Sequence, residues 1–190
     1  MYNLYNLNHI IEASGEGPAQ MVLSTFSSQN SDVNYFVQNN AIDFAKRKIA
    51  VTYLLASNDK VLGIFTLANK NVTIPVDGLS NAQRKRLERF ATLDNDKEKY
   101  TAPAILIAQF SKNSNMGKSV SIQGVDLMHI ALNVVRDIQD AIGGKLVWLE
   151  CESDNCKALD FYHRDDVGFR DFSKRHSEDG TTYIQMLKWL

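Results

Sequence analysis

The first residues suited to chemistry lie in a polar loop in the middle of the chain. The loop follows an apolar segment, residues 104–110, and leads into a helix that begins near Gly124. Where a loop meets a helix N-terminus, unpaired backbone N–H groups and the helix dipole together favour phosphate oxygens. Many loops of this kind have no such role, and neither G-x-G-x-x-G nor G-x-x-x-x-G-K-[ST] occurs, so Rossmann and Walker-type sites have no support. By itself, the loop is a candidate anion site.

A second candidate is the run Asn-Cys-Lys-Ala-Leu-Asp-Phe-Tyr at residues 155–162, which is followed by Gly168 and Phe169. On a short helix, the asparagine, the alanine and the two aromatic residues occupy neighbouring faces. A tyrosine held there can donate a proton to a leaving group from one fixed position. Taken alone, however, Tyr162 is more simply a core residue whose hydroxyl has a partner.

Other titratable residues lack visible partners in the sequence. Glu150 and Glu152 flank the end of a predicted strand and could act as a base through water, although carboxylates there are usually surface groups. His129 and His163 have no neighbour in the sequence that would orient their rings. None of these residues is a strong candidate for a general base.

The two cysteines, Cys151 and Cys156, are read as free thiols. Only four residues separate them, which suits a disulfide only in special geometry. No histidine is adjacent, so we expect neither a metal site nor a cysteine nucleophile activated by histidine.

These segments need a scaffold, and the hydrophobic pattern predicts alternating strands and helices. Strands are expected at residues 2–7, 50–56, 61–67, 104–110 and 146–149 and in a final hairpin over 168–190; helices are expected at 19–26, 32–48, 80–90, 124–142 and 153–162. The strand–helix–strand unit over 104–150 predicts a right-handed crossover between parallel strands. The fold class is therefore α/β with a mixed sheet.

Polar residues mark where the predicted helices begin. Asp32 is expected to cap the second helix, and Ser80 with Gln83 fits the capping box. Ser153 or Asp154 is expected to cap the last helix. The chain is expected to be one domain over residues 1–190, with an insertion at about 69–100.

The charge balance excludes some functions. The 190 residues include 21 Lys and Arg against 22 Asp and Glu, a net charge of -1, which excludes a polycationic coat protein and a polyacidic tail protein. A basic face must therefore be local. Its best candidate is the cluster Arg84, Lys85, Arg86 and Arg89, with Lys112 and Lys118, although a solvated helix face explains this cluster more simply. No leader and no apolar run long enough for a membrane is visible, so a cytoplasmic location is expected.

Together, the two candidate segments resemble the GNAT superfamily of acetyl-CoA-dependent N-acetyltransferases. Its last helix carries N-x-x-A-x-x-[LF]-Y and leads into a strand that begins G-F. The matching residues are Asn155, Ala158, Phe161, Tyr162, Gly168 and Phe169. A branch that includes tRNA-acetylating toxins is similar over nearly the whole chain. That branch has a helical stretch that begins with phenylalanine, matched here by residues 26–45. It then has a hairpin ending G-Y-[YF]-[ST]-L-A, matched by residues 63–68, and a central strand P-x-x-L-L-G-R-L-A-V-D, matched by residues 103–113.

The chain departs from this family at the loop that holds pyrophosphate, [RQ]-x-x-G-x-[GA]. The loop aligns with residues 119–124, where only Gly124 matches and Ile122 replaces a glycine. Backbone N–H groups from Ile122 to Asp126 could still cradle a phosphate because they belong to the main chain. The Asp126 carboxylate would repel it. The lysines that would offset this charge are Lys112 and Lys118.

The resemblance implies a GNAT-like mixed central sheet with helices on both faces. The sheet would be splayed between the fourth and fifth strands, so that the pantetheine arm of acetyl-CoA fits between them. An amine would attack the thioester directly, main-chain groups near Phe110 would polarise the acetyl carbonyl, and Tyr162 would protonate the departing thiolate. The implied cofactor-binding residues are Phe110, Ser111, Lys112, Ile122, Gln123, Gly124, Val125, Asn155 and Phe161, with Tyr162 catalytic and no metal.

The expected function is acetyl transfer to a primary amine, carried by aminoacyl-tRNA, a small molecule or a peptide. The near-neutral charge counts against tRNA, as does Gln109, where the toxin branch has arginine. Two other classes stay open. One is a non-catalytic acyl-CoA-binding or regulatory module, which the altered loop favours and the retained Tyr162 opposes. The other is a protein-interaction partner or homodimer, for which the apolar C-terminal strand is a candidate edge.

Overall fold

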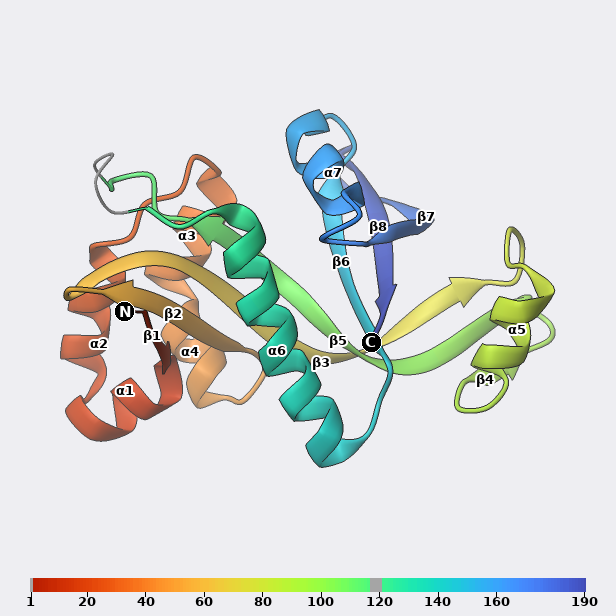
Figure 1. Cartoon of the computed structure of the whole chain (residues 1–190), viewed down its shortest axis with the longest axis horizontal. Coiled ribbons are helices and arrows are strands. Elements are labelled where there is room, and N and C mark those ends of the chain that lie inside the picture. The colour runs from red at the N-terminus through yellow and green to blue at the C-terminus, as the bar shows by residue number, and fades with distance from the viewer. Residues whose placement is uncertain (1, 117–120) are drawn as a thin grey trace. The chain divides into compact units, whose positions relative to one another are not determined.

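The computed structural model of the chain describes residues 2–116 and 121–190. Its eight described strands form one mixed sheet in the order β1-β2-β3-β5-β6-β8-β7, with β4 paired to β5. The chain divides into two compact units (Figure 1). Unit 1 contains Met1–Ala68 and Ile107–Asn133, and unit 2 contains Asn69–Leu106 and Val134–Leu190. Three elements contribute to both units: β3 (Lys60–Pro75), β5 (Lys99–Lys112) and α6 (Gly124–Ile142). The predicted α/β class with a mixed sheet is confirmed.

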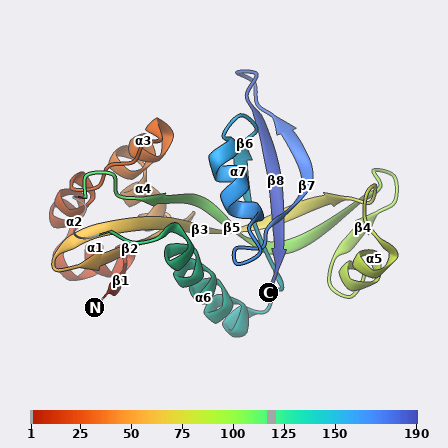
Figure 2. The same cartoon turned by 45° about the horizontal axis from the view of Figure 1, so that its top comes forward.

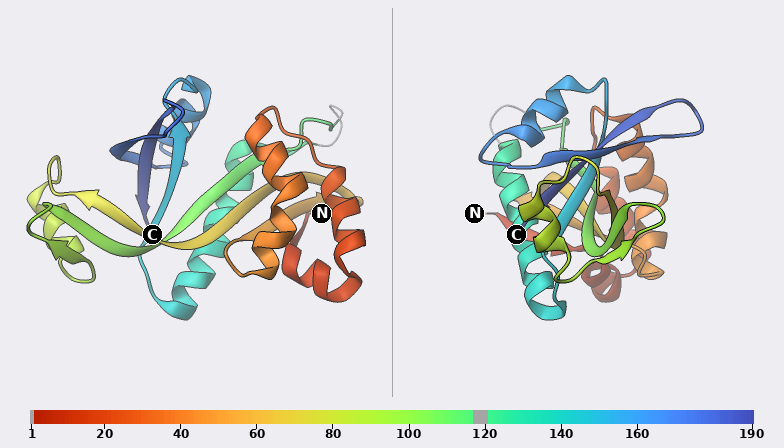
Figure 3. Two further views of the ribbon diagram at one scale, coloured as in Figure 1. Left: turned by 180° about the vertical axis from the view of Figure 1, so that it is seen from behind. Right: turned by 90° about the vertical axis from the view of Figure 1, so that its right-hand side faces the viewer.

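Unit 1 holds the N-terminal elements. They are β1 (Asn3–Asn6), α1 (Leu7–Ser14), α2 (Glu16–Ser24), α3 (Ser31–Asn39), α4 (Ala41–Lys46) and β2 (Val51–Ser57). Strand β2 pairs antiparallel with both β1 and β3, which confirms the hairpin predicted between residues 50 and 67. The left view of Figure 3 shows the four helices lying over these strands.

The core of unit 1 lies between α1–α4 and one face of the β2–β3 hairpin. Leu54 and Ile64 from the strands are buried against helical side chains that include Leu23 and Phe26. Gly63 faces the other side, where a Cβ atom would lie 2.8 Å from Cδ2 of Leu127 in α6. Helices therefore cover both faces of this hairpin, as predicted, and a side chain in place of Gly63 would force Leu127 of α6 to shift.

Two stretches of unit 1 differ from the prediction. Residues 7–14 form α1, where the end of a strand and a turn were expected; buried Leu7 and the side chain of Asn6, which caps the helix by accepting from Asn8 N–H, favour the helix. The single helix predicted at 32–48 is two helices, and its cap is Asn30 rather than Asp32. The Asn30 side chain accepts the N–H of Asp32 at 2.8 Å, so the acidic residue lies in the first turn instead.

Unit 2 contains the remaining elements. They are α5 (Asn81–Leu87), β4 (Thr92–Asp94), β6 (Leu146–Glu152), α7 (Cys156–His163), β7 (Arg170–His176) and β8 (Thr182–Trp189). Strand β8 pairs antiparallel with β6 and β7, and β6 pairs parallel with β5 through Ile105↔Val147 and Leu106↔Trp148. The parallel pair and the final hairpin are thus confirmed. Figure 2 shows α7 lying against β6 and β8.

Residues 69–100, which were predicted as an insertion, lengthen strands β3 and β5 and form helix α5 and the short strand β4. Strand β3 continues to Pro75, β5 begins at Lys99, and α5 and β4 lie between them. The capping box is present: Ser80 Oγ accepts the Gln83 N–H, and the Gln83 side chain accepts the Ser80 N–H at 2.8 Å. Leu87 of α5 is buried with Leu146 and Leu187. The description of these residues as an insertion in a single domain stays a prediction.

Within the described residues, no helix is both long enough and apolar enough to cross a membrane.

Candidate functional site

The two candidate segments belong to different units. The end of β5 and the start of α6 lie in unit 1, whereas α7 lies in unit 2. The slot expected between the fourth and fifth strands, β5 and β6, stays a prediction.

In unit 1, a polar pocket of about 450 Å³ opens at the carboxyl end of β5. It is lined by Ser28, Gln29, Asn30, Leu62, Ser111, Lys112, Asn113, Ser114, Met116, Ser121 and Ile122. Three of these, Ser111, Lys112 and Ile122, are predicted cofactor-binding residues. The structure therefore brings the end of β5 and the residues before α6 together around one cavity, with the loop before α3 as another wall.

Asn113 holds the walls of this pocket together. It is buried, and its side-chain amide donates to the carbonyl oxygens of Val61 at 2.7 Å and Thr25 at 3.2 Å. Its side-chain oxygen accepts the N–H groups of Ser27 at 3.2 Å and Asn115 at 3.0 Å. One residue thus connects β3, the loop after α2 and the loop after β5. Sequence reasoning missed this role, because the partners in β3 and after α2 are distant in the chain.

A pair of hydroxyl groups crosses the same pocket. Ser28 Oγ lies 2.8 Å from Ser111 Oγ, and Ser111 Oγ donates to the carbonyl oxygen of Lys112 at 3.0 Å. Ser28 Oγ also accepts the N–H of Asn30 at 3.0 Å. This network fixes the orientation of the last peptide groups of β5, which are the groups expected to contact an acyl carrier.

The start of α6 has one buried and several accessible residues. Ile122 is 2% exposed, so only its backbone is suited to contact a ligand. Gln123 is exposed, and its carbonyl accepts the Leu127 N–H at 3.2 Å. Gly124 and Val125 are half-buried, and Asp126 is exposed in the first turn. Lys118 and Ser119 lie outside the described residues. Phe110 is half-buried near the end of β5 and does not line the pocket.

In unit 2, Tyr162 lies near the end of α7 and packs with two aromatic rings. The ring of Phe161 lies 5.3 Å away and that of Phe169 lies 6.1 Å away, both edge-on. Burial raises the pKa of Tyr162 above its ordinary value, and the nearby Cys151 thiol raises it further. The hydroxyl therefore keeps its proton throughout the neutral pH range, as a proton donor must.

The N-terminus of α7 corrects one prediction. Asn155, and neither Ser153 nor Asp154, caps the helix: its side-chain oxygen accepts the Ala158 N–H at 3.2 Å. Asn155 thus has a structural role in addition to the cofactor contact predicted for it. In the part of the chain that the structure describes, the amide nitrogen of the same side chain has no hydrogen bond that would compete with that contact.

Two of the candidate bases, Glu150 and His163, have hydrogen-bonding partners in the structure. Glu150 receives hydrogen bonds from Arg175, the shortest at 2.6 Å, and from Gln185 at 2.7 Å. Burial by itself would raise the pKa of Glu150, but these hydrogen bonds and the guanidinium charge lower it overall, so the carboxylate is a weak base. His163 has a partner that the sequence did not reveal, because Asp171 Oδ1 lies 2.6 Å from its Nε2.

Both cysteines are free, as predicted. Cys151 is buried and Cys156 is exposed. Burial raises the pKa of Cys151 to about 11, with contributions from the charges of Glu152 and Asp154. In the described part of the chain, no group of three or more metal-binding side chains occurs.

Comparison with known proteins by sequence finds no match: no family model fits the chain, and no curated protein is significantly similar to it. Comparison of structures finds many. AtaT in complex with acetyl-methionyl-tRNAfMet has a TM-score of 0.64 at 19% identity, over 97% of this chain and 94% of AtaT. A tyrosine-to-phenylalanine variant of KacT has a TM-score of 0.64 at 16% identity, over 97% and 94%. A bacterial toxin has a TM-score of 0.67 at 16% identity, over 100% and 90%. The chain therefore has the fold of these toxins, which is the GNAT-like fold expected from the resemblance.

Proposed function

We propose that this chain is an N-acetyltransferase that transfers an acetyl group from acetyl-CoA to a primary amine by direct attack. The observation that supports this proposal is that Tyr162 lies near the end of α7, half-buried against the rings of Phe161 and Phe169. The fold supports the same conclusion, since AtaT has been solved with acetyl-CoA and with acetyl-methionyl-tRNAfMet.

We assign the polar arm and the phosphates of acetyl-CoA to the pocket at the end of β5, called the β5 pocket, and to the residues next to it. Backbone groups of Phe110, Ser111 and Lys112 would bind the pantetheine amides, and the Lys112 side chain is exposed beside them. N–H groups from Ile122 to Val125 at the start of α6 would face the phosphates. Asn155 and Phe161 would contact the arm from α7. Asp126 opposes the phosphates, so we expect weaker binding than a loop without this carboxylate would give.

When bound, acetyl-CoA supplies the acetyl thioester. Donors at the end of β5 would stabilise the negative charge that develops on the carbonyl oxygen as the amine attacks. A C–N bond forms and the C–S bond breaks, and Tyr162 donates its proton to the departing sulfur. Solvent then returns a proton to the tyrosine.

The amine also loses a proton, and Glu150 near the end of β6 is poorly suited to take it. Glu150 is engaged by Arg175 and Gln185, and its lowered pKa makes it a poor acceptor. An amine of modest pKa, such as that of an aminoacyl ester, transfers its proton to water. The chemistry therefore favours acceptors whose amine is already neutral near pH 7.

Aminoacyl-tRNA is the acceptor that we propose, with small-molecule and peptide amines as alternatives. The neighbouring structure of AtaT with acetyl-methionyl-tRNAfMet supports it. The basic helix α5 contributes less than its sequence indicates, because Arg84 donates to the carbonyl oxygens of Leu79 and Val76 and Arg86 lies over the ring of Trp189. Lys85 and Arg89 are the exposed cations that remain for an acceptor.

The test is transfer of label from radioactive acetyl-CoA into charged tRNA, polyamines and peptides assayed in parallel. We expect label in charged tRNA, released as the N-acetyl amino acid on mild alkaline hydrolysis of the ester. Label in polyamines or peptides alone would reassign the acceptor and retain the activity. Binding of acetyl-CoA with no transfer to any acceptor would support the alternative that the altered loop favours, a non-catalytic acyl-CoA-binding module.

A further inference from the structure

The turn between α7 and β7, residues 164–169, lies directly behind Tyr162. Helix α7 ends at His163, one residue after the tyrosine, and β7 begins at Arg170. The turn closes back on the helix, because the Phe169 N–H donates to the carbonyl oxygen of Tyr162 at 3.0 Å. The rings of the same two residues lie 6.1 Å apart, edge to face. The position of the tyrosine ring therefore depends on the path of this turn.

Arg170 binds the end of α7 through backbone carbonyl groups. The last carbonyls of a helix have no partner within the helix, and a cation nearby also suits the helix dipole. Arg170 Nη1 donates to the carbonyl oxygens of His163 and Phe169, each at 2.9 Å. One guanidinium thus joins the last residue of α7 to the residue before β7. Its ion pair with the fully exposed Asp165, at 3.4 Å, contributes little.

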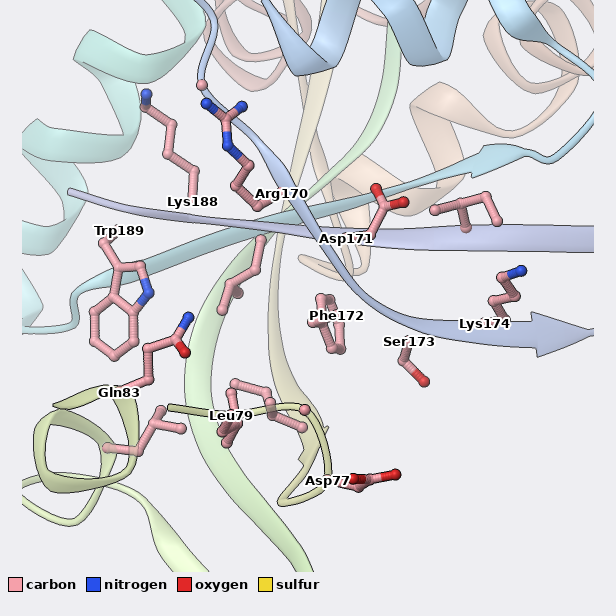
Figure 4. Close-up of a pocket in the computed structure, with 16 residues that line it drawn as sticks. Asp77, Leu79, Gln83, Arg170, Asp171, Phe172, Ser173, Lys174, Lys188 and Trp189 are labelled. Atoms are coloured by element: carbon pink, nitrogen blue, oxygen red, sulfur yellow. The ribbon is translucent and has the colours of Figure 1, made fainter. Parts of the chain in front are cut away.

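Lys188 of β8 holds the same turn from the neighbouring strand. Its Nζ donates to the carbonyl oxygen of Val167 at 2.8 Å. A Cβ atom at Gly168, where φ is +78°, would lie 2.6 Å from this Nζ, so a side chain there would force the ammonium to move. Figure 4 shows the side chains of Lys188 and Arg170 extending to one side of the β7–β8 hairpin, away from Phe172. Both cations therefore serve the turn after α7.

Side chains also join α7 to β7. His163 Nε2 lies 2.6 Å from Asp171 Oδ1. With the two bonds of Arg170, this contact connects the last residue of α7 to the first two residues of β7. Tyr162 comes immediately before this connection, so a shift of its backbone would have to break these bonds.

We propose that Arg170 is a positioning residue for Tyr162, and that Lys188 assists it by holding the turn. The inference rests on the function proposed above, in which Tyr162 donates a proton to the departing sulfur. A proton donor must lie within hydrogen-bond reach of its acceptor, and a misplacement of about 1 Å can cost about 100-fold in rate. Arg170 acts through the backbone of α7 and is not itself the donor. The competing explanation is that Arg170 only stabilises the turn.

The test compares single-turnover acetyl transfer in wild type, Arg170→Met, Tyr162→Phe and the double variant, with the acceptor that the parallel transfer assay selects. Arg170→Met keeps an apolar stem and removes the donors. It should slow transfer about 10- to 100-fold and leave the affinity for acetyl-CoA within about twofold. In the Tyr162→Phe background, the same change should slow transfer by less than about twofold, because the group that it positions is already absent.

Arg164→Gln is the matched control. Arg164 is an exposed arginine of the same turn, and its guanidinium bonds to the carboxylate of Asp166 at 2.6 and 2.9 Å. In the described part of the chain, this guanidinium donates to no backbone carbonyl, so the variant should transfer at the wild-type rate. Arg170→Lys keeps a charged donor and should recover part of the rate. Lys188→Met is the second variant if Arg170→Met does not fold, and it should slow transfer several-fold only when Tyr162 is present.

A measurement without turnover completes the test. In NMR spectra of protein with 13C-labelled tyrosine, the Tyr162 ring signal is the one that Tyr162→Phe removes. Arg170→Met should shift this signal, and Arg164→Gln should not. Equal slowing by Arg170→Met in both backgrounds, or an unchanged rate with an unchanged signal, would overturn the inference. Transfer by Tyr162→Phe at the wild-type rate would instead contradict the proposed proton donor, and the ring signal would still decide whether Arg170 fixes its position.

Discussion

The side-chain amide of Asn113 donates a hydrogen bond to the carbonyl oxygen of Val61 at 2.7 Å, across 52 residues of sequence. The same amide nitrogen also donates to Thr25 O at 3.2 Å. Asn113 stands where the toxin branch that this sequence resembles has aspartate, and an aspartate could not donate to these two carbonyls. The position of the β5 pocket walls therefore depends on an amide at this position.

Asn113→Asp should destabilise the protein by about 2–4 kcal/mol at pH 7, because it buries a negative charge against two carbonyl oxygens that lose their donors. It should also weaken acetyl-CoA binding, since the pocket walls are no longer joined. Urea unfolding and calorimetric titration measure the two effects. Asn115→Asp is the matched control, because Asn115 is exposed. An Asn113→Asp protein as stable as the wild type would contradict the role assigned to the amide.

The two thiols should differ strongly in reactivity. Since burial raises the pKa of Cys151 to about 11, its thiolate fraction at pH 8 is on the order of 100-fold below that of an ordinary thiol. In Cys156→Ser protein, alkylation by iodoacetamide should be slow at pH 8 and accelerate up to about pH 11. In Cys151→Ser protein, exposed Cys156 should react quickly. Equal rates in the two variants at pH 8 would show that Cys151 is accessible and ionised.

The Glu150–Arg175 pair should contribute stability that depends on pH. Since the pKa of Glu150 is lowered in the folded state, its contribution is present above the unfolded-state value, about 4.3, and is lost as the pH falls through the folded value. Glu150→Gln should therefore cost about 1 kcal/mol at pH 7, and this cost should shrink progressively as the pH falls below about 4. Thermal unfolding of both proteins between pH 3 and pH 7 measures this difference. A constant difference over the whole range would mean that packing, and not charge, is responsible.

The basic residues of helix α5 and Arg89, which follows the helix, should differ in their roles. Arg84→Gln removes donors to Leu79 and Val76 carbonyls and should lower the free energy of unfolding by about 1–2 kcal/mol. Lys85→Gln with Arg89→Gln should change stability by less than about 0.5 kcal/mol. If the acceptor is tRNA bound along this helix, the double variant should reduce the salt dependence of tRNA binding by about two units of slope. An unchanged slope would exclude this helix from the acceptor site.

Much of the scaffold could be predicted because local patterns determine it. The capping box at Ser80, the long helix from Gly124 and the parallel strands on either side of that helix follow from residue types within a few positions of each other. The start of α3 was placed correctly to within two residues, but its cap is Asn30 because two good capping residues compete there. The helix α1 was missed because Leu7 fits both an alternating strand and the first turn of a helix.

The contacts that shape the candidate site could not be predicted in this way. The side chain of Asn113 donates to Val61 and Thr25, which lie 52 and 88 positions earlier in the chain. The charge of Glu150 is neutralised by Arg175, which lies 25 positions later, on β7. No local rule links such pairs, since they depend on sheet register and on how the loops close over it. Residue types alone made Tyr162 and the loop after β5 weak candidates, and their assignment to acetyl transfer came from the pattern they share with a known family. The actual roles of Asn155 as a helix cap and of Gly63 as a close-packing residue required the structure.

The central claim is that Tyr162 protonates the leaving thiolate during acetyl transfer. Single-turnover transfer from labelled acetyl-CoA, with the acceptor that the parallel transfer assay selects, should be at least about 100-fold slower in Tyr162→Phe than in wild type, the range typical of general acid catalysis. The affinity for acetyl-CoA should stay within about twofold, and Tyr35→Phe, a change at a residue that is 65% exposed, should have no effect. Equal single-turnover rates in Tyr162→Phe and wild type would contradict the account.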